Sequence, residues 1–292
     1  SVYTPLMPEW LAVICLGIIE GITEFLPVSS TGHLLLAEHW LPRQSDLFNT
    51  VIQIGAVLAV MLIFTGRLRQ LLFQWREPAS QDYLAKLIAA FVITGIGGLV
   101  LKKGGFKLPE TVTPVAMATL VGGILFLAVE HWLRGRTAGA QLTWATAVLV
   151  GLGQLLAAVF PGASRSGATI LVALVLGLSR PAATEFSFLL GIPTLISAGA
   201  LEIAGALRHP SGEPIDWGMI LLGSTAAAVT AFGVVKWLLR FVQSHTFVGF
   251  AWYRIVLGVA ILLWARSESP EAKPGPRAAP RTEIIQRAGV AR

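Results

Sequence analysis

Six apolar runs dominate this sequence, and each has roughly the length of about 20 residues that a helix needs to cross a lipid bilayer. They are residues 47–65, 84–101, 112–133, 186–207, 217–239 and 247–265. Only 13% of the 292 residues are charged and the mean hydropathy is +0.71, whereas soluble chains carry roughly a quarter charged residues. We therefore expect an all-α polytopic membrane protein with six transmembrane helices, not a soluble helical bundle.

Two further regions contain apolar pieces interrupted by polar, proline-bearing turns. Trp10–Ile19 and His33–Trp40 flank the first turn, which contains Pro27. Leu142–Phe160 and Ala168–Leu178 flank the second, PGASRSGAT. Irregular backbone at membrane depth is tolerated where protein buries it or where it lines a wet cavity. We predict that these regions form two re-entrant helical hairpins.

The order of these elements repeats along the chain. Residues 8–133 and 142–265 each contain one hairpin and three spans, and EFLPVSS in the first half resembles VFPGAS in the second. An odd number of spans places the halves in opposite orientations, so we predict an inverted repeat whose broken helices meet at the site. We expect one membrane domain over 1–265 and a disordered basic tail over 266–292.

The charged segments bear on topology and on partners. Arg67, Arg134 and Arg240 lie near loops that would share one side, which the positive-inside rule makes cytoplasmic. The basic tail falls on the other side and nearly cancels this bias, so charge alone does not decide topology. We predict a basic loop after residue 65. The basic residues show no pattern typical of a nucleic-acid-binding protein.

Cys15 is the only cysteine, which excludes an internal disulfide. We expect no cleavable signal peptide before it.

Glu20 and Glu24 lie four residues apart, on one face of the first hairpin. Two carboxylates so placed can share a divalent cation, or one of them can hold a proton for acid–base chemistry. The structural alternative is that they accept hydrogen bonds from the broken backbone. Because two intramembrane carboxylates in register are expensive, we favour a functional role.

A run of small hydroxyl residues, Ser29, Ser30 and Thr31, then leads through Gly32 to His33. Hydroxyls and N–H groups at a helix start bind anionic oxygens well. Simple N-capping by Ser30 or Thr31 is the structural alternative, and both roles could hold together.

The second turn supplies a permanent cation, Arg165, between Ser164 and Ser166, and Thr169 continues the same helix start. The planar guanidinium matches phosphate oxygens, and at membrane depth it needs an anion, either a ligand or Glu20 and Glu24. The structural alternative is an Arg–Glu pair that joins the hairpins. Together the two turns suit hydrolysis or transfer of a phosphoryl group on a lipid-borne substrate.

The segments EGITEFLPVSSTGH and PGASRSGAT resemble the two signature motifs of the undecaprenyl-pyrophosphate phosphatases, the bacitracin-resistance integral membrane phosphatases. The likeness extends to FNTVIQIGAVLAV and SRPAATEFSFLLGIPT, and the tail after Arg266 lies outside it. It implies removal of the terminal phosphate from undecaprenyl pyrophosphate, which recycles the carrier lipid for peptidoglycan synthesis. It also implies a divalent cation, Mg²⁺ or Ca²⁺. The protein would lie in the bacterial inner membrane, with its active site facing the periplasm.

The resemblance also suggests roles for individual residues. Glu20 and Glu24 would hold the metal or position the attacking group, Arg165 would grip the pyrophosphate, and His33 would act as acid–base or phosphate contact. Ser30 is the candidate nucleophile, with direct attack by water as the alternative. The substrate-binding residues would be Ser29, Thr31, Ser164, Ser166 and Thr169.

A transporter or lipid flippase is the rival interpretation, because inverted repeats with broken helices are typical of transporters. A transporter has no need for two turns rich in hydroxyls around an arginine and a histidine. A purely structural membrane scaffold leaves the buried charges unexplained. The sequence does not indicate an oligomeric state.

Overall fold

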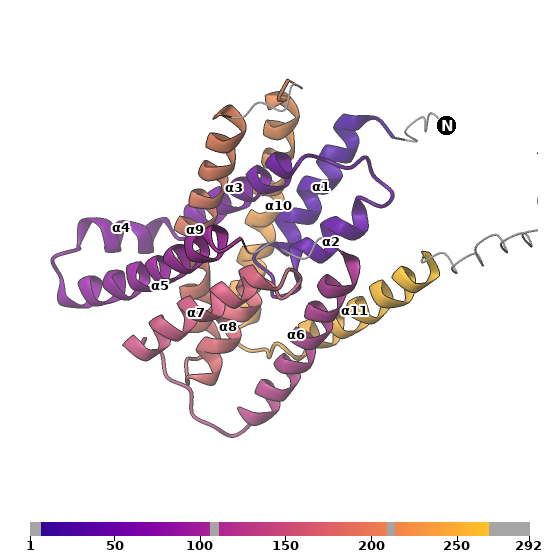
Figure 1. Ribbon diagram of the computed structural model, residues 1–292. Helices are drawn as coiled ribbons and strands as arrows, with labels where there is room; N and C mark the ends of the chain where they lie inside the picture. The colour runs from indigo at the N-terminus through magenta and orange to yellow at the C-terminus, as the bar shows by residue number, and fades with distance from the viewer. Residues whose placement is uncertain (1–6, 106–110, 209–213, 269–292) are drawn as a thin grey trace, which may run out of the picture.

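The computed structural model describes residues 7–105, 111–208 and 214–268, and this part of the chain contains eleven helices (Figure 1). They are α1 Glu9–Thr23, α2 Ser30–Ala37, α3 Asp46–Ile63, α4 Thr65–Phe73, α5 Pro78–Lys103, α6 Val112–Trp132, α7 Trp144–Val159, α8 Arg165–Val175, α9 Arg180–Arg208, α10 Trp217–Phe241 and α11 Val248–Glu268.

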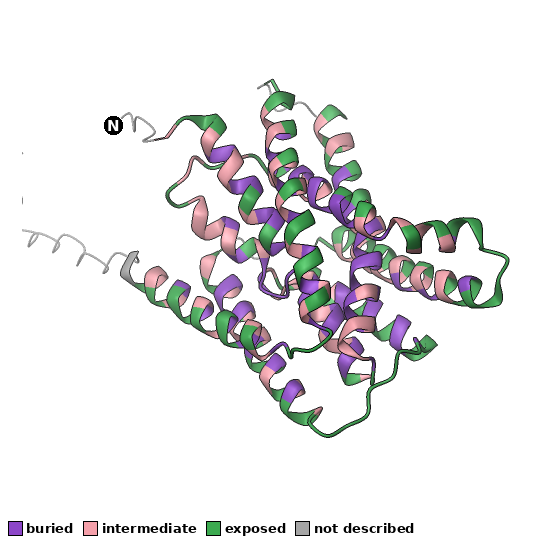
Figure 2. Ribbon diagram, turned by 180° about the vertical axis from the view of Figure 1, so that it is seen from behind, coloured by how far each residue is buried: buried purple, intermediate pink, exposed green. Residues whose placement is uncertain are grey.

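Six of these helices, α3, α5, α6, α9, α10 and α11, are long and apolar enough to cross a membrane. This confirms the six predicted spans, and the chain is an all-α, multi-pass membrane protein. Its buried positions gather toward the middle of the helix assembly (Figure 2). Large apolar side chains such as Leu62, Val229 and Val256 remain exposed on the outside, where lipid takes the place of water.

Four shorter helices, α1, α2, α7 and α8, lie in the two regions predicted as hairpins. α1 packs against α2 around the first turn, and α7 packs against α8 around the second. The re-entrant course of these pairs and the inversion of one half relative to the other stay predictions.

Small residues bring the membrane helices close together. α6 and α11 lie side by side (Figure 1), with Gly123 on α6 against the backbone of Ala251 and Gly258 on α11 against the backbone of Ala116. Gly17 and Gly21 of α1 likewise lie against backbone carbonyls of α10. Contacts of this kind let backbones approach where no hydrophobic effect drives helices together.

Two local predictions were wrong. The basic segment after residue 65 forms helix α4, because its side chains find partners in other helices. Arg67 pairs with Glu185 at 3.0 Å and lies over the ring of Tyr83, and Leu71 is buried. Helix α11 continues to Glu268, so the first residues of the predicted disordered tail are helical. Residues 269–292 lie outside the described part of the chain.

Candidate active site

The two turns that follow α1 and α7 have the same local geometry. Ser29 precedes α2 and Ser164 precedes α8, and the hydroxyl of each accepts a hydrogen bond from the N–H of the glycine three residues later, at 3.3 and 3.1 Å. The N-cap of α2 is therefore Ser29, and not Ser30 or Thr31, the residues considered for this role as the structural alternative. The matched serines are 135 residues apart, which supports the predicted repeat.

Both cap serines have an unusual backbone conformation. Their φ angles are +76° and +70°, a region that residues other than glycine rarely occupy. Such conformations cost on the order of 1–3 kcal/mol and persist only where surrounding contacts impose them, which is typical of functional sites.

Side chains from the two turns meet directly. Nη2 of Arg165 lies 3.1 Å from Oε1 of Glu24, and the hydroxyl of Ser30 donates to the other oxygen, Oε2, at 2.8 Å. Glu24 is only 7% exposed. The structure thus brings Arg165 of the second turn to Glu24 and Ser30 of the first, more than a hundred positions away in the sequence. The Arg–Glu pair weighed as a structural alternative is present.

One nitrogen of the Arg165 guanidinium has no hydrogen-bond partner among the described residues. Its Nη1 donates to the carbonyl of Ser187 on α9 at 3.1 Å, and the guanidinium lies 5.2 Å from the ring centre of Phe25. Its Nε is buried and has no hydrogen-bond partner among the described residues. A buried donor of this kind is favourable only when an acceptor fills the site.

The hydroxyls of the second turn have partners within the protein. Ser166 is fully buried and donates to the carbonyl of Leu26 at 2.9 Å, which attaches α8 to the first turn. Thr169 is also buried and pairs with the hydroxyl of Ser187 at 2.6 Å, which attaches α8 to α9. Ser166 and Thr169 therefore position Arg165. Thr31, the remaining hydroxyl residue predicted to bind substrate from the first turn, is exposed.

His33 lies between the first turn and α11. Its Nδ1 is 2.7 Å from the carbonyl oxygen of Ser29, which can only accept, so Nδ1 carries the hydrogen. Its Nε2 is 2.6 Å from the hydroxyl of Tyr253. Among the described residues it makes no hydrogen bond to Glu24 or Arg165. Sequence reasoning missed Tyr253, which the motifs do not include.

Glu20 is completely buried one helical turn before Glu24. Neither of its carboxylate oxygens has a hydrogen-bond partner among the described residues, although Glu24 and Arg165 lie within electrostatic reach. No group of three or more His, Cys, Asp or Glu side chains in the described ranges is placed to hold a metal ion.

Arg254 of α11 joins both turns and was not identified from the sequence. It is fully buried, and its guanidinium donates to the carbonyls of Pro27 in the first turn at 3.0 Å and of Gly162 and Ala163 in the second at 3.2 and 3.0 Å. Nε also donates to the carbonyl of Thr119 on α6. The available signal was a single arginine inside an apolar span, which is costly unless its donors are used.

The contact from α6 repeats this arrangement at the same spacing. Thr119, 135 residues before Arg254, donates its hydroxyl to the carbonyl of Gly162 at 3.2 Å. Gly162 is in turn 135 residues after Pro27, the acceptor of Arg254. Matched positions on α6 and α11 thus satisfy matched carbonyls of the two turns, which buried backbone requires.

Replacing Arg254 by alanine should destabilise the folded protein. The truncation leaves several buried carbonyls without donors, which costs about 3 kcal/mol or more. We expect the midpoint of thermal unfolding in detergent to fall by about 6 °C or more. Trp252→Ala, at an exposed neighbour on the same helix, is the control. An Arg254→Ala protein with the wild-type midpoint would show that the turns do not depend on this residue.

Comparisons with known proteins identify a matching family and similar proteins. Residues 13–260 match the family described as bacitracin resistance protein BacA. The chain is 51% identical over 255 residues to an undecaprenyl-diphosphatase of Rhizobium etli. These aligned residues cover 87% of this chain and 96% of that protein. It is 46% identical to an undecaprenyl-diphosphatase of Xanthomonas axonopodis pv. citri and 47% identical to one of Xylella fastidiosa, over 88% of this chain and 98% and 99% of those proteins.

Proposed function

The chain belongs to the bacitracin resistance protein BacA family, and we propose that it hydrolyses undecaprenyl pyrophosphate to undecaprenyl phosphate and inorganic phosphate. The observation that carries the proposal is the meeting of Arg165 with Glu24 and Ser30, at two adjacent helix starts in a membrane protein. We place the enzyme in the bacterial inner membrane with its site facing the periplasm. There it would recycle the carrier lipid for peptidoglycan synthesis and so confer bacitracin resistance.

In this proposal Arg165 binds the terminal phosphate. The free Nε of its guanidinium donates to a phosphate oxygen, and the N–H groups at the starts of α2 and α8 favour anionic oxygens nearby. Its bond to Glu24 fixes the side chain in place before substrate arrives. Positioning and charge stabilisation of this kind supply most of the rate in phosphoryl transfer.

Ser30 is the proposed nucleophile, because its hydroxyl already donates to a carboxylate that can take the proton. Its Oγ would attack the terminal phosphorus, the anhydride P–O bond would break, and undecaprenyl phosphate would leave. Water would then hydrolyse the phosphoserine to release inorganic phosphate. In the alternative route water attacks directly, held by the Ser30 hydroxyl and the Glu24 carboxylate.

We assign His33 to proton transfer or phosphate contact. Because its Nε2 bonds Tyr253, a proton that reaches or leaves this nitrogen passes by way of the tyrosine hydroxyl. Tyr253 therefore belongs to the proposed site through His33.

A divalent cation, Mg²⁺ or Ca²⁺, fits the residues present. Glu20 offers two buried carboxylate oxygens that lack partners, and both ions prefer oxygen ligands. We propose that Glu20 and Glu24 would hold this ion. When bound, it would neutralise charge on the pyrophosphate.

Purified protein should release inorganic phosphate from undecaprenyl pyrophosphate, and Ser30→Ala should lower kcat by about 100-fold or more, because removal of a nucleophile leaves only binding and charge stabilisation. A phosphate-release assay in detergent measures the turnover of the wild-type protein and of Ser30→Ala. Near-normal turnover by Ser30→Ala would contradict the covalent route and leave attack by water. Movement of the lipid across vesicle membranes without phosphate release would instead favour the flippase.

Mg²⁺ or Ca²⁺ should raise the midpoint of thermal unfolding of the wild-type protein, since an ion that binds only the folded state stabilises it. In Glu20→Gln this ion-dependent rise should disappear, because the amide cannot supply the charge. Glu202→Gln, at an exposed position on α9, should keep it. An equal rise in Glu20→Gln and wild type would place the ion elsewhere.

A further inference from the structure

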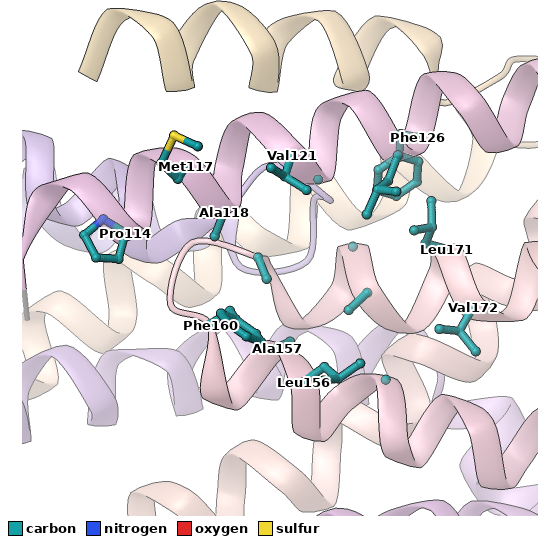
Figure 3. A pocket seen from close by; sticks show the side chains of 16 residues that line it. Pro114, Met117, Ala118, Val121, Phe126, Leu156, Ala157, Phe160, Leu171 and Val172 are labelled. Carbon is teal, nitrogen blue, oxygen red and sulfur yellow. The ribbon is translucent and has the colours of Figure 1, made fainter. Parts of the chain in front are cut away.

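Two apolar pockets lie beside the two turns. The α11 pocket has a volume of about 620 Å³ and lies among α1, α10, α11 and the first turn. The α6 pocket has a volume of about 570 Å³ and lies among α6, α7, α8 and the second turn; Figure 3 shows Met117 and Phe160 on opposite walls of it. Both volumes fall in the range of small-molecule sites.

The pockets are related by the same spacing of 135 residues as the turns. Three pairs of lining residues show this relation: Ile22 and Ala157, Val28 and Ala163, and Gly249 and Pro114. At two further matched positions the chemistry differs. The α11 pocket has His33 and Tyr253 where the α6 pocket has Ala168 and Ala118.

We infer, building on the proposed function, that the α11 pocket binds the first isoprene units of the polyprenyl chain, with the His33–Tyr253 pair at its phosphate end. The pocket borders the proposed site, because His33 lines it together with Thr23, the residue before Glu24. Apart from Thr23, His33 and Tyr253, its residues are aliphatic, aromatic or glycine. A hydrocarbon chain that leads from a phosphate matches this lining.

The pocket also reaches the outer surface of the helix assembly. Trp237 and Tyr253 line it and are 50% and 48% exposed. A long chain could therefore leave the pocket into the surrounding lipid without crossing water. The α6 pocket is lined by apolar residues and glycine alone and includes none of the proposed catalytic residues, so it makes a matched internal control.

Gly249 is the place to test this assignment. It lines the α11 pocket on the first turn of α11, and a Cβ added there would meet no atom within 4 Å. Gly249→Trp should fill the pocket and displace part of the chain. Each buried CH₂ contributes roughly fourfold to an equilibrium constant, so loss of a few should be easy to measure.

The experiment compares kcat/KM for undecaprenyl pyrophosphate with that for a single-isoprene pyrophosphate. In Gly249→Trp this ratio should fall by about tenfold or more, mainly through KM for the long chain. Pro114→Trp, at the matched position of the α6 pocket, should keep the wild-type ratio. An unchanged ratio in Gly249→Trp, or a fall in Pro114→Trp, would overturn the assignment.

A second measurement needs no variant. A photoreactive polyprenyl pyrophosphate should label wild-type protein on α1, α10 or α11, and labelling confined to α6, α7 or α8 would overturn the inference. The proposed function fails separately, if wild-type protein hydrolyses neither pyrophosphate.

Discussion

The carbonyl groups of two broken helices need hydrogen-bond donors inside a membrane protein, and Arg254 supplies donors to both breaks at once. In hydrocarbon an unpaired backbone group costs several kcal/mol, so the turns could not persist without such contacts. The guanidinium has five donors in a rigid plane, which lets one side chain satisfy carbonyls from separate segments. Thr119 adds a further donor from α6.

This scaffold explains how a reactive group can be held ready in an apolar setting. Ser166 ties α8 to the first turn, and Ser29 and Ser164 cap the starts of α2 and α8. Arg165 then reaches Glu24, and Glu24 in turn accepts from Ser30. The charged groups are partly neutralised by each other, yet the Nε of Arg165 and the carboxylate of Glu20 keep unused capacity for a ligand.

Much of this arrangement was predictable, because it follows from the length of the apolar runs and from the free-energy cost of an unpaired charge at membrane depth. The six spans are readable from apolar runs, and the meeting of Arg165 with a glutamate follows from the price of an unpaired charge at membrane depth. Glu24 as the partner was one of two options that the sequence left open.

Other features depend on tertiary contacts that no local pattern records. The cap at Ser29 needs a backbone angle that sequence reasoning assigns to glycine, and α4 exists because Arg67 finds Glu185 and Tyr83 in other helices. The roles of Arg254 and Tyr253 depend on where α11 crosses the turns. A lone arginine in a span indicates that partners exist, without indicating which.

The central claim is that the two turns form one site in which Arg165 and Glu24 act as a unit. A double-mutant cycle on kcat/KM, with Glu24→Gln, Arg165→Lys and the double variant, tests it most directly. Residues that act as a unit lose their joint contribution once either is changed, so the double variant should be about as active as the worse single variant. If the two losses multiplied instead, Glu24 and Arg165 would act independently and the account of a shared site would be wrong.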